Sequence, residues 1–207
     1  LLAFILVVGM IASSPGGRQE RAKVAAKRGG ELFAVYQPRE LAGTGLIELT
    51  IALSEPGRSY DSSEGNRRNI LLLNKATGES RRILPANDRR IGKMTYLSQN
   101  GQFQEGSEPS LSVAGGSEAE QTPEAYAYYV LEVYSNPKSD AAFDVLVGRL
   151  ADGRQQTVMR GVGGVESVWM IGPQRMGLIV REKEGLHHRV IDLSTLKVVS
   201  TRQIEIG

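Results

Sequence analysis

From Glu31 onward, short runs of β-branched and aromatic residues alternate with turn residues, and helical periodicity is nearly absent. This pattern predicts an all-β domain, because a strand needs only a few such residues between turns, whereas a helix needs a longer amphipathic stretch. The hydrophobic content of 41% is enough for a real core. The expected strands cover residues 32–36, 46–53, 70–74, 79–83, 93–97, 126–134, 143–150, 154–159, 166–171, 176–181, 188–193 and 198–206.

Three of the expected hairpins repeat one layout, an apolar strand, a polar turn and a second strand, over residues 69–84, 143–158 and 188–201. Gly78 and Gly153 supply the positive φ that such turns need. Leu196 stands near that place in the third hairpin, so a different turn is expected there. Two further strands precede each hairpin. The sequence therefore predicts three groups of about four antiparallel strands, over Glu31–Leu84, Ile91–Met159 and Val165–Ile206.

The segment from Val133 to Gly153 begins with the sequence Val-Tyr-Ser-Asn-Pro-Lys-Ser-Asp. In this segment an expected strand ends in Ser, a polar loop follows, and a second expected strand leads to a turn that contains Gly. This segment resembles a blade of the TolB-type β-propellers, and residues 69–84 and 176–198 resemble parts of one. The resemblance implies propeller-like units. The Pro-Asp-Gly turn of that family is not found, and closed propellers typically have about four to eight blades. The sequence is consistent with either an incomplete propeller or a stacked-sheet domain.

Residues 1–14 are predicted to form a membrane-anchor helix that is truncated at its start. The apolar run ends at Ala12 and would cover about 18 Å as a helix, against a hydrocarbon core of about 30 Å. An uncleaved export signal is the alternative to a retained anchor. The residues expected to face lipid are Leu1, Leu2, Phe4, Ile5, Leu6, Val7, Val8 and Ile11.

Residues 15–30 are predicted to be a basic juxtamembrane linker, helical over 18–28, that attracts anionic lipid or is simply solvated. A second basic window, residues 67–93, could contact a protein partner or lipid, or form a solvated hairpin edge. Nucleic acid is not expected, because this window has no interleaved aromatic residues on its strands. The candidate partner or lipid contacts are Arg18, Arg21, Lys23, Lys27, Arg28, Arg67, Arg68, Arg81, Arg82, Arg89 and Arg90.

The β-rich domain, residues 31–207, contains an insertion over 98–124 that is rich in Gly, Ser, Gln and Glu and has no basic residue. It is expected to be a loop that a partner orders, or a solvated insertion. The chain is expected to lie at the inner membrane with this domain in the periplasm. The cytoplasmic face is the alternative, because basic residues beside a membrane helix tend to stay cytoplasmic.

No metal site, no cofactor and no catalytic activity is expected. The chain has no Cys, and its two histidines, His187 and His188, are adjacent and would point to opposite faces of a strand. Residues 161–164 are Gly-rich but lack the spacing of a dinucleotide-binding loop, so a turn between sheets is expected there. No motif of a known catalytic class is found. Glu182 and Glu184 share parity, but this alone does not distinguish catalytic from surface acids.

Tyr126, Tyr128 and Tyr134 share parity on one expected strand, which predicts an aromatic face that is either core or a recognition surface. Trp169 is expected in the core.

These features together predict a non-catalytic, membrane-anchored accessory or structural subunit. Its β-domain would contact other subunits of a larger membrane complex, respiratory, photosynthetic or of the envelope. The alternative is a periplasmic ligand-binding module for glycan or peptide, with a pocket lined by Tyr126, Tyr128 and Trp169. The sequence does not identify a small-molecule ligand.

Overall fold

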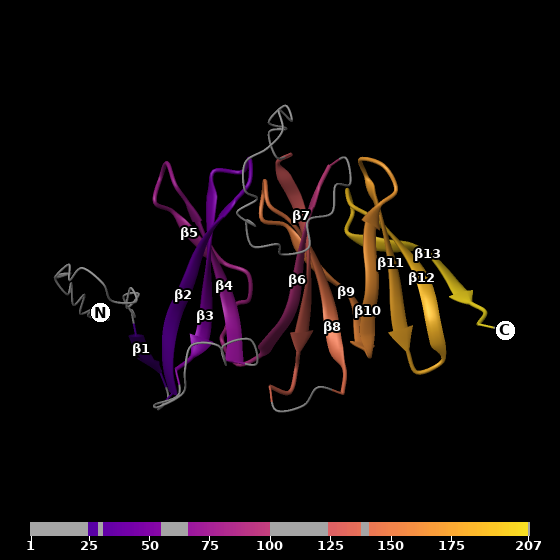
Figure 1. The fold of residues 1–207 in the computed structure, drawn as a ribbon, viewed down its shortest axis with the longest axis horizontal. Coiled ribbons are helices and arrows are strands. Elements are labelled where there is room, and N and C mark those ends of the chain that lie inside the picture. The colour runs from indigo at the N-terminus through magenta and orange to yellow at the C-terminus, as the bar shows by residue number, and fades with distance from the viewer. Residues whose placement is uncertain (1–24, 29–30, 55–65, 100–123, 138–140, 207) are drawn as a thin grey trace, which may run out of the picture.

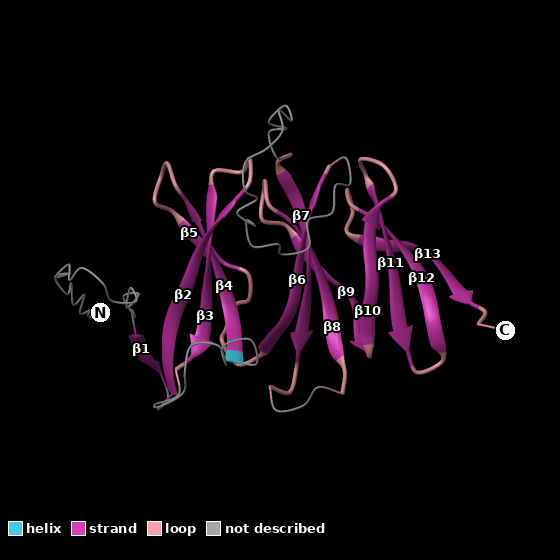
Figure 2. Ribbon diagram, in the orientation of Figure 1, coloured by secondary structure: helices cyan, strands magenta, loops and turns pink. Residues whose placement is uncertain are grey.

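A computed structural model of the chain describes residues 25–28, 31–54, 66–99, 124–137 and 141–206. The described residues form thirteen strands and no α-helix, and the one short segment coloured as helix in Figure 2 is Asn66, in the 3-10 conformation. The all-β prediction is confirmed for this part of the chain. The expected membrane anchor lies outside it.

The strands make three antiparallel sheets, each a meander in which neighbours in sequence are neighbours in space. The first sheet contains β1 (Ala25–Arg28), β2 (Glu31–Leu41), β3 (Leu46–Leu53), β4 (Arg67–Asn74) and β5 (Ser80–Arg82). The second contains β6 (Arg90–Ser98), β7 (Tyr126–Tyr134), β8 (Phe143–Arg149) and β9 (Gln155–Val162). The third contains β10 (Gly164–Met170), β11 (Arg175–Glu182), β12 (Gly185–Asp192) and β13 (Lys197–Ile204). The three predicted groups of strands are confirmed.

Strand β1 corrects the expectation for the basic linker. Ala25–Arg28 pair antiparallel with residues 31–34 of β2, so the predicted helix is wrong for these four residues. Only Gly29 and Gly30 separate the two strands in sequence, which is the length of the tightest hairpin connection. Helix propensity is a weak preference that pairing with a sheet edge overrides.

The three sheets stand side by side in chain order, each facing the next (Figure 1). The middle sheet is covered on both faces. Tyr129, Leu131 and Val133 of β7 pack toward the first sheet, and Tyr128 and Val130 pack toward the third. A strand buried on both sides needs a nearly continuous apolar run rather than alternation, which explains the sequences of β7 and β8.

The hairpin turns confirm the glycine predictions and correct the one for the third hairpin. Gly78 and Gly153 have φ of 72° and 71°, and Leu196 has φ of 55° at the corresponding position. The third turn therefore uses a similar left-handed residue, despite the cost of a Cβ there. The Leu196 side chain is buried in the core between the second and third sheets, which offsets this cost.

The glycine-rich segment marks the passage between sheets, as predicted. Only Gly163 separates β9 of the second sheet from β10 of the third, and its N–H donates to the Arg181 carbonyl at 2.8 Å. Strand β10 therefore starts directly beside the second sheet, at the edge of the third.

Candidate functional site

The candidate site is a cavity of about 430 Å³ between the second and third sheets, which we call the β6–β10 slot. Lys93 and Thr95 of β6 and Val130 and Glu132 of β7 line one side of it. Residues 165–168 of β10 line the other. Thr95 and Val130 are cross-strand partners, and Val130 belongs to the core shared with the third sheet. The slot therefore lies on the face of the second sheet that is turned toward the third.

One side of the slot is the edge of a strand. Residues 165–168 of β10 line it, and the register shift at Glu166 breaks the usual alternation of side chains there. Strand β10 pairs with β11 on one side, and no strand among the described residues pairs with its other side. Alternate residues of such an edge direct their backbone N–H and C=O groups away from the sheet. The slot is thus bordered by a strand that has one side without a paired strand among the described residues.

Glu132 supplies the central charge of the slot. Its Oε2 accepts a hydrogen bond of 3.1 Å from the Lys93 backbone N–H. No side-chain nitrogen of a Lys or Arg among the described residues lies within 4.0 Å of this carboxylate. Burial raises the pKa of Glu132, and the hydrogen bond from Lys93 and the charges of Lys93 and Arg90 oppose that rise. Glu132 is therefore a half-buried acid that lacks a contacting cation.

The backbone of β6 is shaped to accommodate Glu132. The pairing of β6 with β7 shifts register between Ile91 and Met94, so Gly92 and Lys93 form an irregularity opposite Glu132. A Cβ on Gly92 would lie 2.6 Å from Glu132 Oε2 and 2.7 Å from Tyr134 Cε2. Only a glycine leaves room here for both side chains.

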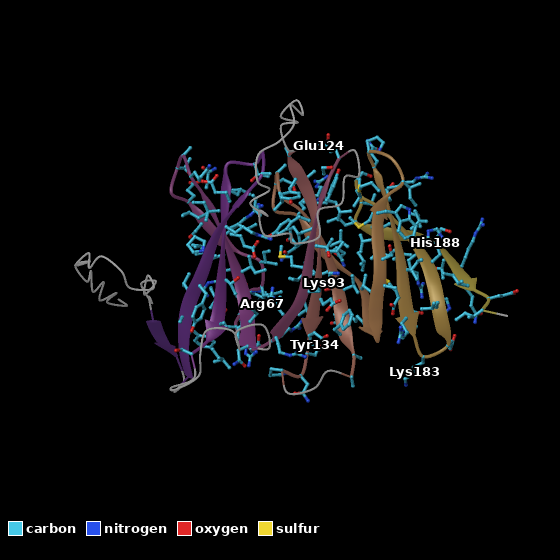
Figure 3. The ribbon with its side chains drawn as sticks, in the orientation of Figure 1. Arg67, Lys93, Glu124, Tyr134, Lys183 and His188 are labelled. Carbon is cyan, nitrogen blue, oxygen red and sulfur yellow. The ribbon has the colours of Figure 1, made fainter. Side chains whose placement is uncertain are left out.

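Contacts of Arg90, Tyr134 and Phe143 hold the ends of β6 and β7 in place next to Glu132. The Arg90 guanidinium lies 3.8 Å from the centroid of the Tyr134 ring, and the rings of Tyr134 and Phe143 are 5.2 Å apart. Figure 3 labels Lys93 on β6 and Tyr134 on β7. The cation–π contact and the ring pair hold the region in place without using the Glu132 carboxylate.

The second carboxylate of the slot is already neutralised. Glu166 occupies a register shift in β10, between Val165 and Ser167. Its Oε1 lies 2.8 Å from Nη2 of Arg181 on β11. Glu132 and Glu166 therefore differ, since only Glu166 has an ion-pair partner among the described residues.

The three tyrosines predicted to share a face do not share one. Residues 97 and 98 of β6 pair with Tyr128 and Tyr126, so Ala127 is an extra residue that reverses the alternation. Tyr128 and Tyr134 contact the core with the third sheet. Tyr126 contacts the core with the first sheet, and its ring lies 5.3 Å from that of Tyr96.

Trp169 is not in the core, contrary to the prediction. Its neighbours Val168 and Met170 pack against the second sheet, so Trp169 faces away from it. The indole stacks on His188 with centroids 5.4 Å apart and an interplanar angle of 6°. The expected pocket of Tyr126, Tyr128 and Trp169 is therefore wrong, and no aromatic residue is among the described residues that line the slot.

The basic window does not form one surface patch. Arg68 is buried, Arg81 donates to the Leu150 carbonyl at 2.5 Å, and Arg90 lies on Tyr134. Arg67 is half-buried, whereas Arg82 and Arg89 are exposed.

Several predicted residues fall where the structure describes little or nothing. Lys27 and Arg28 lie on β1, but their side chains are outside the described part. The anchor residues and Arg18, Arg21 and Lys23 are outside it entirely. Of the acidic insertion, only its two ends are described, and the Ser98 hydroxyl donates to Glu124 Oε2 at 2.7 Å across its base.

The two histidines lie on opposite faces of β12. His187 is cross-strand from Val180, and its Nδ1 lies 3.3 Å from Glu182 Oε2. His188 is on the other face, against Trp169. Within the described residues, no three metal-ligating side chains come together. No helix in the same part of the chain is long and apolar enough to cross a membrane.

Comparisons with protein families, with curated proteins and with solved structures found no match to this chain. The site therefore rests on its own geometry. Sequence reasoning placed Lys93 only in the basic window and missed Glu132 and Glu166, and the three residues lie far apart in the chain. One signal was present, because Glu132 is the only charged residue in the otherwise apolar and aromatic run of β7.

Proposed function

We propose that the protein is a non-catalytic, membrane-anchored accessory subunit, whose β-domain contacts a larger membrane protein complex, respiratory, photosynthetic or of the envelope. The anchor in this proposal is the apolar segment 1–14, and the β-domain is placed in the periplasm. In the same proposal the three sheets are an incomplete TolB-like propeller whose end sheet meets the partner.

The supporting observation is the outward face of the first sheet. Ile70 and Leu72 of β4 pack toward the second sheet, so Leu71 and Leu73 face away from it. Their cross-strand partners on β3 are Leu49 and Ile47. Four half-buried aliphatic side chains are thus contiguous on the outer side of the stack, and no element of the described chain packs on them.

The opposite end of the stack differs in chemistry. The outward face of the third sheet exposes Arg181 and Arg202 beside Ile179 and His188. An antiparallel end sheet normally turns polar residues to water, and the third sheet does so at Arg181 and Arg202, although Trp169 and Ile179 lie on the same face. A contiguous apolar face favours burial against another protein, at about 25 cal/mol for each Å² removed from water.

The test replaces Leu49 by Arg in the full chain and isolates the protein from solubilised membranes of the cells that make it. Leu49→Arg should lose the co-purifying subunits. The matched control, Ile179→Arg, also puts a charge on an outward half-buried position and should retain them. Both variants should keep the β-type circular dichroism of the unmodified chain. Recovery of the unmodified chain alone, as a stable monomer, would contradict the proposal, and so would retention of the subunits by Leu49→Arg.

The alternative of a ligand-binding module gains one observation, the β6–β10 slot itself. Its lining favours a peptide over a glycan, because it offers a strand edge and charged side chains and no aromatic ring for a sugar to stack on.

A further inference from the structure

We propose that the β6–β10 slot binds an extended, basic peptide segment of a partner protein. The segment pairs with β10 as an added strand and places a Lys or Arg side chain against Glu132. This inference goes beyond the accessory role proposed above and does not depend on the outward face of the first sheet.

The edge of β10 supplies the main recognition element. One side of β10 has no paired strand among the described residues, and residues 165–168 border the cavity. An extended peptide that adds to such an edge gains backbone hydrogen bonds whatever its sequence. The slot volume, about 430 Å³, lies within the range of ordinary binding pockets, about 300–1,000 Å³.

The same molecule shows this kind of addition on another sheet. In the first sheet, β1 pairs with the edge of β2, the strand that otherwise begins the meander. Strand β10 likewise begins the meander of the third sheet, and four of its residues border the slot. A strand in the slot would therefore repeat an arrangement that the fold already contains.

Glu132 determines the charge of the segment. Its carboxylate accepts the one backbone hydrogen bond from Lys93, and within the described residues no Lys or Arg side-chain nitrogen contacts it. The charges of Lys93 and Arg90 act on this half-buried carboxylate from a distance, and a peptide Lys or Arg would add a cation in direct contact with it. Glu166 does not compete for this cation because Arg181 already pairs with it.

The slot also restricts the type of side chain that the peptide can place two residues away from its basic residue, on the same face. Val130 lies two residues from Glu132 on β7, and side chains two residues apart on a strand share a face. An extended segment over β7 would place a basic side chain at Glu132 and an apolar side chain at Val130. The preferred pattern is therefore a basic residue, any residue, then a small apolar residue.

The test uses the full chain in detergent and a labelled, end-capped peptide. Every second residue of this peptide is Lys or Val in turn, so that both lie on one face of the extended chain, and the residues between them are Thr. Fluorescence anisotropy gives its affinity. A matched peptide with Glu for Lys should bind at least about tenfold more weakly, because an ion pair to a half-buried acid is replaced by a repulsion. N-methylation of alternate backbone nitrogens should weaken binding by a similar factor, because it blocks strand pairing.

The variant Glu132→Gln keeps the size of the side chain and should weaken binding of the Lys peptide about tenfold. The same variant should strengthen binding of the Glu peptide, because it removes the repulsion between two carboxylates. The control Glu40→Gln removes an exposed acid on β2 and should leave the affinity unchanged. Leu49→Arg should also leave it unchanged, so failure here is distinguishable from failure of the accessory role. Hydrogen exchange should slow at residues 165–168 when the Lys peptide binds.

Three results would overturn the proposal. The first is no binding of the Lys peptide to the unmodified chain. The second is equal binding by the unmodified chain and Glu132→Gln, or by the N-methylated and parent peptides. The third is a dimer of the chain that the Lys peptide dissociates in sedimentation, which would assign the slot to a second copy. If Glu132→Gln does not fold, the comparison between the Lys, Glu and N-methylated peptides still decides the matter.

Discussion

The indole of Trp169 lies over Gly177, its cross-strand partner on β11, so closely that a Cβ on Gly177 would come within 2.5 Å of Cε2. Tyr129 and Gly148 repeat this relationship in the second sheet, where a Cβ would come within 2.1 Å of the Tyr129 Cζ. Glycine inside a strand weakens pairing, and here each glycine is covered by the aromatic ring opposite it. These glycines are therefore required by a close approach rather than by a turn.

We expect Gly177→Ala to displace Trp169 from its stack on His188 and to destabilise the chain by about 1–3 kcal/mol, the usual cost of overpacking. Trp169 is the only tryptophan, so its fluorescence emission reports the displacement directly. Gly163→Ala is the control, because a Cβ there meets only the Arg181 carbonyl oxygen, at 3.4 Å. Unchanged emission in Gly177→Ala would show that the ring does not lie over the glycine.

At Leu196 the glycine variant should be more stable than the alanine variant, which is the reverse of the usual order of stability. Both substitutions remove a buried side chain, which costs about 2–5 kcal/mol for alanine. Glycine also relieves the left-handed backbone at φ 55°, a strain of about 1–2 kcal/mol. Leu196→Gly should therefore be more stable than Leu196→Ala in urea denaturation. At Leu193, which is buried in the same turn without a positive φ, the alanine variant should be the more stable one. The same order at both sites would contradict this account.

The turn after β12 should contribute a pH-dependent stability. Hydrogen bonds from Ser194 and Thr195 lower the pKa of Asp192 to about 2, from an ordinary value near 4. A lowered folded-state pKa stabilises the fold above the unfolded-state pKa, and this contribution disappears as pH falls from about 4 through about 2. The difference in free energy of unfolding between the unmodified chain and Asp192→Ala should therefore shrink over that interval. A constant difference from pH 7 to pH 2 would exclude this role for Asp192.

Tyr129 should resist ionisation. Burial raises its pKa to about 12, and its hydroxyl donates to Gln155 Oε1 at 2.7 Å. Because the folded-state pKa is higher than the unfolded value of about 10, this group favours the fold below pH 10 and its contribution is lost as pH rises through 12. Ultraviolet titration of the unmodified chain and of Tyr129→Phe checks this. The absorbance difference should appear only near pH 12, and its appearance near pH 10 would place the hydroxyl in water.

The sequence by itself determined where the strands lie and how they group. Turn residues and strand-forming runs act locally, so β3 and β7 begin and end where expected, and the three groups of strands correspond to the three sheets. The left-handed positions of Gly78 and Gly153 follow from the same local chemistry. Helix propensity failed at Ala25–Arg28, because pairing with β2 decided the conformation.

Only the tertiary structure decided which side chains meet. An extra residue at Ala127 moves Tyr126 to the other face of β7, and nothing in the alternation of the sequence marks it. In β7 both faces are buried, so an apolar run cannot show which side faces which neighbour. Lys93, Glu132 and Glu166 come together because β10 crosses beside the second sheet after Gly163. The local period of a strand fixes neither register nor the packing of one sheet on another, and the slot depends on both.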